Sequence, residues 1–261
     1  MASVRPPAVA GLFYPGAAKD LDAAVGDCLA SAEAEGAAPK ALIAPHAGYV
    51  YSGPVAASAY ARLTAHHDTI ARVVLLGPAH RVPFAGLATS AASAFLTPFG
   101  EVPVDAAAVG RALALPQVRV LDAAHEMEHS LEVQLPFLQR VLDRFALAPF
   151  VVGDATPEDV AEVIELLWGG PETLVVVSSD LSHYLDYDGA RRSDAATARA
   201  IEALRPDDIA PDQACGRLPI QGLLRVARAH GLKVSTVDLR NSGDTAGPRD
   251  EVVGYGAWVF A

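Results

Sequence analysis

Histidine and aspartate side chains directly follow three apolar runs in this sequence. The run Ala41–Ala44 leads to His46, and "VVLLGPAH" ends in His80. The run "LVVVSSDLSH" ends in Asp180 and His183. Imidazole and carboxylate groups bind metals and transfer protons. Because ligands of open α/β sheets bind beyond the carboxyl ends of the strands, these side chains are expected to meet in one crevice.

A single histidine near a strand end has a simpler interpretation as a packed structural residue. The same pattern after separate strands changes that balance, so we interpret His46 and His80 as metal ligands. Asp180 and His183 are interpreted as site residues, although Asp180 could instead cap the turn that follows it. His125 has no such context and is expected on the surface of a loop.

Cys215 lies shortly before Pro219, where the sequence predicts the start of a helix. The positive end of a helix favours an anion, so the pKa of a thiol there is expected to be lowered. Beside two histidines, Cys215 becomes a candidate third ligand, and its alternative role is that of a small buried hydrophobe. Cys28, inside an amphipathic stretch, is assigned to packing.

Three further residues are weaker candidates for the crevice. His129 precedes Ser130, a possible helix N-cap, and is expected to reach toward the crevice. Tyr49 follows His46 closely, and its alternative role is packing at the start of a helix. Asp244, in the polar loop "NSGDTAG", could border the crevice or simply occupy a turn.

Composition narrows the class of protein. The 261 residues are 51% hydrophobic and carry a net charge of −11, with no basic cluster for a nucleic acid. No window approaches the roughly 18–20 apolar residues of a transmembrane helix, so no membrane partner is expected. The N-terminus lacks the apolar segment of a signal peptide, which predicts a cytoplasmic protein. Two cysteines make a disulfide framework improbable there.

Apolar runs alternate with longer amphipathic stretches, which predicts an α/β fold with a mixed, mainly parallel sheet and helices on both faces. No linker divides the chain, so one domain over residues 1–261 is expected. The predicted strands are Ala41–Ala44, Arg72–Leu76, Gly86–Thr89, Phe150–Val152, Thr173–Val177, Lys233–Leu239 and Tyr255–Phe260. The predicted helices are Lys19–Ala34, Pro54–Ala65, Asp105–Leu113, Ser130–Phe145, Pro157–Trp168, Tyr187–Ala203 and Pro219–His230.

Five motifs, "APHAGYVYSG", "LLGPAH", "EHSLEVQLPFLQ", "SSDLSHY" and "ACGRLPI", occur in this order. Together they resemble the Memo family, whose microbial members are called AmmeMemoRadiSam system protein B. The resemblance extends from "AGLFYPG" near the start to "VVGYGAWVF" at the end, so it covers essentially the whole chain.

The resemblance implies a fold related to the class III extradiol dioxygenases of the LigB type. Those enzymes hold non-haem Fe(II) on two histidines and one carboxylate. By this resemblance His46 and His80 match the two histidine ligands, and Cys215 falls where the dioxygenases place a glutamate. His183 matches their acid–base histidine, and Asp180 is expected to orient it.

A cysteine in place of a carboxylate makes the implied site softer, so iron is expected first, with copper or zinc as competitors. The expected function is that of a metal-dependent oxidoreductase with a small-molecule or peptide substrate. The alternatives are a non-catalytic metal-binding scaffold for peptides or partner proteins, and a zinc-dependent hydrolase. The name of the system implies AMMECR-type and radical SAM proteins as partners.

Overall fold

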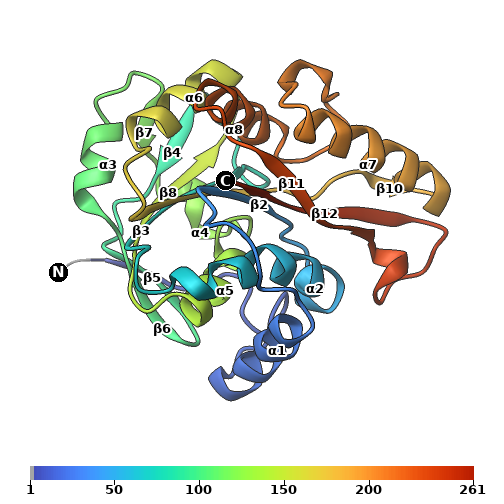
Figure 1. Cartoon of the computed structure of the whole chain (residues 1–261). Helices are drawn as coiled ribbons and strands as arrows, with labels where there is room; N and C mark the ends of the chain where they lie inside the picture. Colours follow the sequence, from blue (N-terminus) through green and yellow to red (C-terminus); the bar gives the residue numbers. More distant parts are fainter. Residues whose placement is uncertain (1–2) are drawn as a thin grey trace.

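The computed structural model describes residues 3–261 as a layered α/β structure, in which helices cover both faces of a large sheet (Figure 1). The α-helices are α1 (Ala18–Ala30), α2 (Tyr49–Tyr60), α3 (Ala106–Ala112), α4 (Ala123–Glu126), α5 (Leu135–Val141), α6 (Pro157–Leu166), α7 (Tyr187–Glu202) and α8 (Arg217–Ala229). Short 3-10 helices are η1 (Ala61–His66), η2 (Glu132–Gln134), η3 (Pro206–Asp208) and η4 (Ser242–Asp244).

The strands form one large sheet and one small sheet. Their bounds are β1 (Val4–Arg5), β2 (Ala41–Ala44), β3 (Arg72–Pro78), β4 (Leu87–Thr89), β5 (Ala94–Thr97), β6 (Gly100–Pro103), β7 (Val118–Val120), β8 (Ala146–Val152), β9 (Thr173–Ser178), β10 (His183–Leu185), β11 (Val234–Asn241) and β12 (Val252–Phe260). The nine-stranded sheet has the order β10-β12-β2-β9-β3-β8-β4-β7, and β11 also pairs with β12.

The predicted mixed α/β fold is confirmed, and the parallel pairing lies at its centre. Strands β2, β9, β3 and β8 run parallel, whereas β12 and β4 join them antiparallel on either side. Strand β9 lies between β2 and β3, so the turn that follows β9 projects between the loops after those two strands. The three-stranded sheet β1-β5-β6 was not predicted, because strands this short carry little periodic signal.

Alternate residues of the central strands face opposite helical layers. Leu42 and Val176 pack in the core beneath α1, α2 and α5. Ile43 and Val177 pack in the core beneath α6, α7 and α8. Every residue of β9 is buried, as expected for a strand covered on both faces. The two layers are visible below and above the sheet in Figure 1.

Several predicted helix boundaries are confirmed. The hydroxyl of Thr156 accepts from the backbone N–H of Asp159 at the start of α6. Gly231, just after α8, has φ +69°, the left-handed conformation that glycine adopts most easily. The predicted helix from Ser130 to Phe145 is divided, and Pro136 lies in the first turn of its second part, α5.

The predicted start of α2 at Pro54 is wrong, because the helix begins at Tyr49 and contains the proline. Proline has no N–H to donate to the carbonyl four residues earlier, which here belongs to Val50. Val50 is 65% exposed, so water can satisfy that carbonyl. An interior proline is tolerated where the helix faces solvent.

The N-terminal residues are tied to the segment that precedes α5. The Arg5 guanidinium donates to a Glu132 carboxylate oxygen at 2.6 Å and to the Glu128 carbonyl oxygen at 2.6 Å. Glu132 also accepts from the Tyr14 hydroxyl at 2.7 Å. Arg5 and Glu132 are both buried, so they form a charge pair inside the protein.

The expectation that His125 lies on the surface is wrong, since the residue is only 2% exposed. Its Nε2 donates to the Ala88 carbonyl oxygen at 3.0 Å, and burial lowers its pKa to about 4. His125 therefore packs α4 against β4.

Over the described residues 3–261, the helices are all too short or too polar to cross a bilayer.

Candidate metal centre

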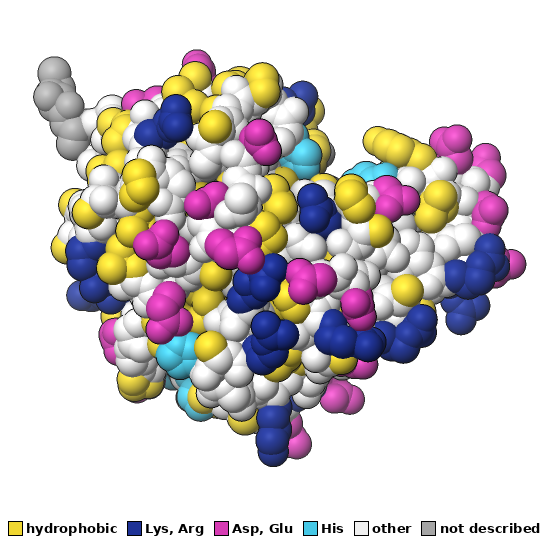
Figure 2. All heavy atoms as spheres, turned by 90° about the horizontal axis from the view of Figure 1, so that it is seen from above, with side chains coloured by type: hydrophobic (Ala, Val, Ile, Leu, Met, Phe, Trp, Pro, Cys, Tyr) yellow, Lys and Arg dark blue, Asp and Glu magenta, His cyan; other side chains and the backbone are white. Residues whose placement is uncertain are grey.

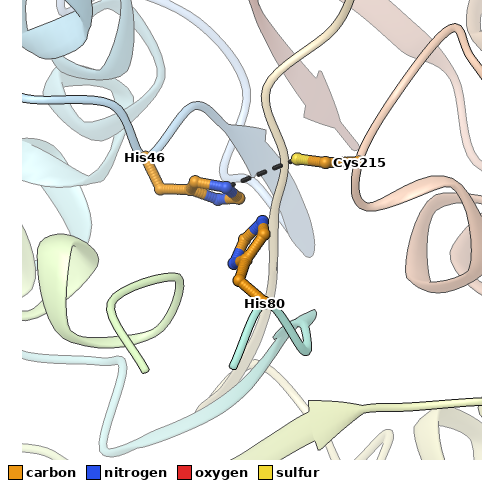
Figure 3. Close-up of side chains that lie close together, drawn as sticks. All are labelled: His46, His80 and Cys215. Atoms are coloured by element: carbon orange, nitrogen blue, oxygen red, sulfur yellow. Dashed lines mark hydrogen bonds between the residues drawn. The ribbon is translucent and has the colours of Figure 1, made fainter. Parts of the chain in front are cut away.

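Three side chains that could bind a metal converge at the carboxyl edge of the central strands (Figure 3). His46 follows β2, His80 follows β3, and Cys215 precedes α8. One donor atom from each residue lies within 4.8 Å of the other two. The Cys215 sulfur is 3.4 Å from His46 Nε2, and the two imidazole centroids are 5.2 Å apart.

Glu128 holds His80 in position. Its Oε1 accepts from His80 Nδ1 at 2.8 Å, and its Oε2 accepts from the His80 backbone N–H at 2.6 Å. Because Nδ1 donates to the carboxylate, the lone pair of His80 lies on Nε2 and is available for a metal.

The Glu128 side chain is almost fully buried, which alone would raise its pKa. The hydrogen bonds and the charge of His80, together with backbone N–H groups, outweigh burial and lower the pKa to about 2. The carboxylate also accepts from the backbone N–H groups of His129 and Ser130, both at 2.9 Å. With four donors already bound, Glu128 serves as the support of His80 rather than as part of a second metal site with His80 and His129.

His46 is only 1% exposed and is anchored from two sides. Its Nδ1 lies 2.8 Å from the Ser178 hydroxyl at the end of β9, and its backbone N–H donates to Asp180 Oδ1 at 2.8 Å. Burial, followed by the charges of His80 and His129, places its pKa well below the usual value. A neutral imidazole is the form that binds a metal.

The expected lowering of the Cys215 pKa is wrong. Helix α8 begins only at Arg217, and the thiol is enclosed between that helix and the turn after β9. Burial and then the charge of Asp180 raise the pKa of Cys215 to about 12. The group is thus a thiol in the metal-free protein, and a bound cation would have to displace its proton.

Asp180 and His183 approach the centre, but they are not bonded to each other. His183 Nδ1 donates to the Leu181 carbonyl oxygen at 2.8 Å, which leaves Nε2 as its free acceptor. Asp180 instead positions the His46 backbone, so the expectation that it orients His183 is wrong. Burial raises the pKa of Asp180 to about 6, against the hydrogen bond from His46 and the charge of His183, which lower it.

A cavity of about 450 Å³ opens beside these residues and is lined by Phe13, Tyr51, His129, Asp180, His183 and Tyr255, among others. A second cavity, of about 360 Å³, reaches His80 and Cys215. Figure 2 shows a notch between the main body and the lobe at the right, with histidine side chains on both sides of it. The candidate centre is therefore accessible to ligands.

Of the weaker candidates, His129 does line the larger cavity, and its ring stacks on His80 with centroids 4.6 Å apart. Burial and the nearby His80 lower its pKa to about 4. Tyr49 does not line it: the residue is 5% exposed, and its hydroxyl donates to the Val133 carbonyl oxygen. Asp244 likewise lies outside the lining and accepts from the Tyr187 hydroxyl at 2.5 Å.

The sequence reasoning missed the residues that support the ligands. Glu128 is 48 positions from His80, and Ser178 is 132 positions from His46. The only available signals were the pair "EH" before α5 and the serines of "SSD".

A family model described as Memo-like protein matches residues 5–259. The chain belongs to this family. A MEMO1 family protein from Aquifex aeolicus is 36% identical, with 98% of this chain and 99% of that protein covered. A MEMO1 family protein from Ignicoccus hospitalis is 34% identical, with 98% of this chain and 98% of that protein covered. Another from Methanococcoides burtonii is 36% identical, with 98% of this chain and 99% of that protein covered.

A crystal structure of an uncharacterised protein from Escherichia coli K12 has a similar fold, with a TM-score of 0.54 at 11% identity. The match covers 84% of this chain and 98% of that chain. At this low identity the likeness concerns the fold alone.

Proposed function

We propose that the chain binds iron through His46, His80 and Cys215 and acts as a non-haem iron oxidoreductase. The convergence of these three donor atoms within 4.8 Å carries the proposal. In zinc sites, bonds of about 2.0 Å to nitrogen and about 2.3 Å to sulfur hold the ligand atoms roughly 3.5 Å apart, so donor atoms within 4.8 Å of one another would need only a modest closure to share a metal ion. Glu128 occupies His80 Nδ1 and Ser178 occupies His46 Nδ1, so Nε2 of each ring is available for the metal.

Iron on two imidazoles and one thiolate supplies redox chemistry and keeps coordination positions open for a substrate and dioxygen. The protein supplies the cavity that binds the substrate, either a small molecule or a peptide side chain. His183 contributes its free Nε2 as a proton acceptor at the cavity wall. His129, which is neutral at pH 7, offers a polar but uncharged surface beside it.

The proposal is tested by anaerobic metal analysis and absorption spectroscopy of the purified protein and of Cys215→Ser. We expect bound iron and a thiolate-to-metal band, and loss of the band in Cys215→Ser. Cys28→Ser, which changes the other cysteine inside α1, is the matched control and should keep the band. Wild-type protein without the band, or a band that survives in Cys215→Ser, would remove Cys215 from the site.

Turnover is tested separately by oxygen uptake of the Fe(II)-loaded protein with catechol-like compounds. We expect uptake that falls strongly in His183→Ala while iron content is unchanged. If no such compound supports uptake and the variant behaves as wild type, the oxidoreductase proposal fails even if iron is bound.

The same donors suit zinc, and a zinc-dependent hydrolase is the second candidate, because two histidines and one cysteine leave a position for water. Stoichiometric zinc without iron in the purified protein would favour it. Copper is the other competitor for a thiolate site.

Exposed apolar side chains near the cavity support a third candidate, a scaffold that binds a peptide or a partner protein. Leu12 is 79% exposed, Tyr184 is 73% exposed, and both line the cavity. AMMECR-type and radical SAM proteins of the same system are the partners to test by co-purification. Failure to recover either protein would argue against this candidate.

A further inference from the structure

A chain of buried hydrogen bonds leads from helix α2 to His46. The Tyr60 hydroxyl donates to Gln134 Oε1 at 2.7 Å, and Gln134 Nε2 donates to the Ser178 hydroxyl oxygen at 2.7 Å. Ser178 in turn lies 2.8 Å from His46 Nδ1. Tyr60, Gln134 and Ser178 are all 0% exposed, so water does not compete for these groups.

The direction of each hydrogen bond follows from neighbouring groups that can only donate or only accept. Gln134 Nε2 also lies 2.9 Å from the Pro45 carbonyl oxygen, which only accepts. The nitrogen of the amide must therefore face Pro45 and Ser178, and its oxygen must face Tyr60. If the amide were flipped, the Gln134 side-chain oxygen would face the Pro45 carbonyl oxygen inside the protein, with no hydrogen between them.

The Ser178 hydroxyl has one proton and two lone pairs. It lies 2.6 Å from the Ser130 carbonyl oxygen, which can only accept, so the proton points there. Gln134 donates to one lone pair. The remaining lone pair can only accept, and the group that faces it is His46 Nδ1.

The geometry points to Ser178 as a positioning residue, which fixes His46 as the tautomer with its proton on Nδ1 and its lone pair on Nε2. The alternative tautomer would leave the Ser178 hydroxyl oxygen and the Ser130 carbonyl oxygen as two facing acceptors inside the protein, which is unfavourable. Nε2 is the atom that faces the Cys215 sulfur at 3.4 Å. The tautomer is a property of the metal-free protein. Its consequence, a His46 Nε2 lone pair that faces a metal, rests on the proposed metal centre.

The test begins with metal-free protein labelled with nitrogen-15 in histidine. Long-range proton–nitrogen NMR spectra at pH 8 distinguish the two neutral tautomers, and His46 is assigned by the loss of its signals in His46→Gln. We expect the Nδ1–H pattern in the wild type and a shift to Nε2–H in Ser178→Ala. An Nε2–H pattern for His46 in the wild type overturns the inference without any variant being needed.

Zinc affinity, measured by competition with a chromophoric chelator, gives the second readout. Loss of the residue that hydrogen-bonds the other ring nitrogen of a metal-binding histidine weakens metal binding by about 10–100-fold, and this loss of affinity is expected for Ser178→Ala. Ser178→Thr retains the hydroxyl and should recover most of the affinity. Thr89→Val removes a buried hydroxyl that has no partner among the described residues, and it should change neither readout. Equal zinc affinity in Ser178→Ala and the wild type would refute the positioning role. Wild-type protein that binds neither zinc nor iron would refute the metal centre and leave the tautomer result standing.

Discussion

Replacement of Glu128 by glutamine is expected to weaken both the fold and the metal centre. The carboxylate accepts four hydrogen bonds, two of them from His80, and its side chain is 2% exposed. Glutamine keeps the shape, but its amide nitrogen cannot accept. At least one of the facing N–H groups would therefore be left unpaired in a buried place.

The pKa of Glu128 gives the size of the expected loss of stability. A carboxyl with an unfolded value of 4.5 and a folded value of about 2 contributes about 3 kcal/mol to stability at pH 7. Because the folded pKa is depressed, this contribution is present above pH 4.5 and is lost as the pH falls toward 2. Glu128→Gln removes the ionisable group, so we expect a loss of about 3 kcal/mol at pH 7 and a smaller difference in acid.

The assay is urea unfolding of metal-free protein at pH 7, together with zinc competition at the same pH. Zinc affinity is expected to fall by about 10–100-fold, because His80 loses the charged acceptor that holds both its Nδ1 and its backbone N–H. Glu165→Gln is the control, since that carboxylate forms a half-exposed pair with His230 and should matter by less than about 1 kcal/mol. A loss below about 1 kcal/mol in Glu128→Gln, with unchanged zinc affinity, would refute the reasoning.

Three further predictions concern stability and are checked by urea unfolding. Arg5→Met leaves Glu132 buried without its cation and should cost about 3–5 kcal/mol, and a cost near zero would show that the pair is dispensable. Gly216→Ala places a Cβ 2.6 Å from the Ser179 Cβ, so it should lose about 1–3 kcal/mol and displace Cys215, seen as weaker zinc binding. Burial raises the pKa of Asp194 from 3.8 to about 6, so the contribution of this group to stability should fall as the pH rises between these values. Relative to the wild type, Asp194→Asn should gain stability over that pH range and reach a gain of about 3 kcal/mol at pH 7, and a difference that does not change with pH would contradict the assignment.

The candidate ligands His46 and His80 could be predicted because each follows a buried strand. Ala41–Ala44 and Thr173–Ser178 are apolar runs that only a strand covered on both faces explains, and the site residues follow at their carboxyl ends. Parallel order then brings His46 and His80 to one edge without any knowledge of distant contacts. Cys215 was indicated by its place before a predicted helix and by the family motifs, because no strand pattern points to it.

The supporting residues could not be predicted, because their roles depend on packing between distant segments. Glu128, Ser178 and Arg5 each act on a residue at least 48 positions away. The pKa of Cys215 was mispredicted for a related reason. The helix start suggested a stabilised anion, whereas enclosure of the thiol and the nearby Asp180 decide the direction.

The place of β12 in the sheet has a consequence for how the protein is made. Strand β2, which leads to His46, pairs with β12 along one side, through Ile43 and Trp258. During synthesis β2 leaves the ribosome long before its partner exists, and until then it presents an unpaired edge, a known hazard for aggregation. The Arg5 contact with Glu128 likewise joins residues 123 positions apart. The candidate metal centre can therefore assemble only after nearly the whole chain has been translated, so a metal that binds there should bind late.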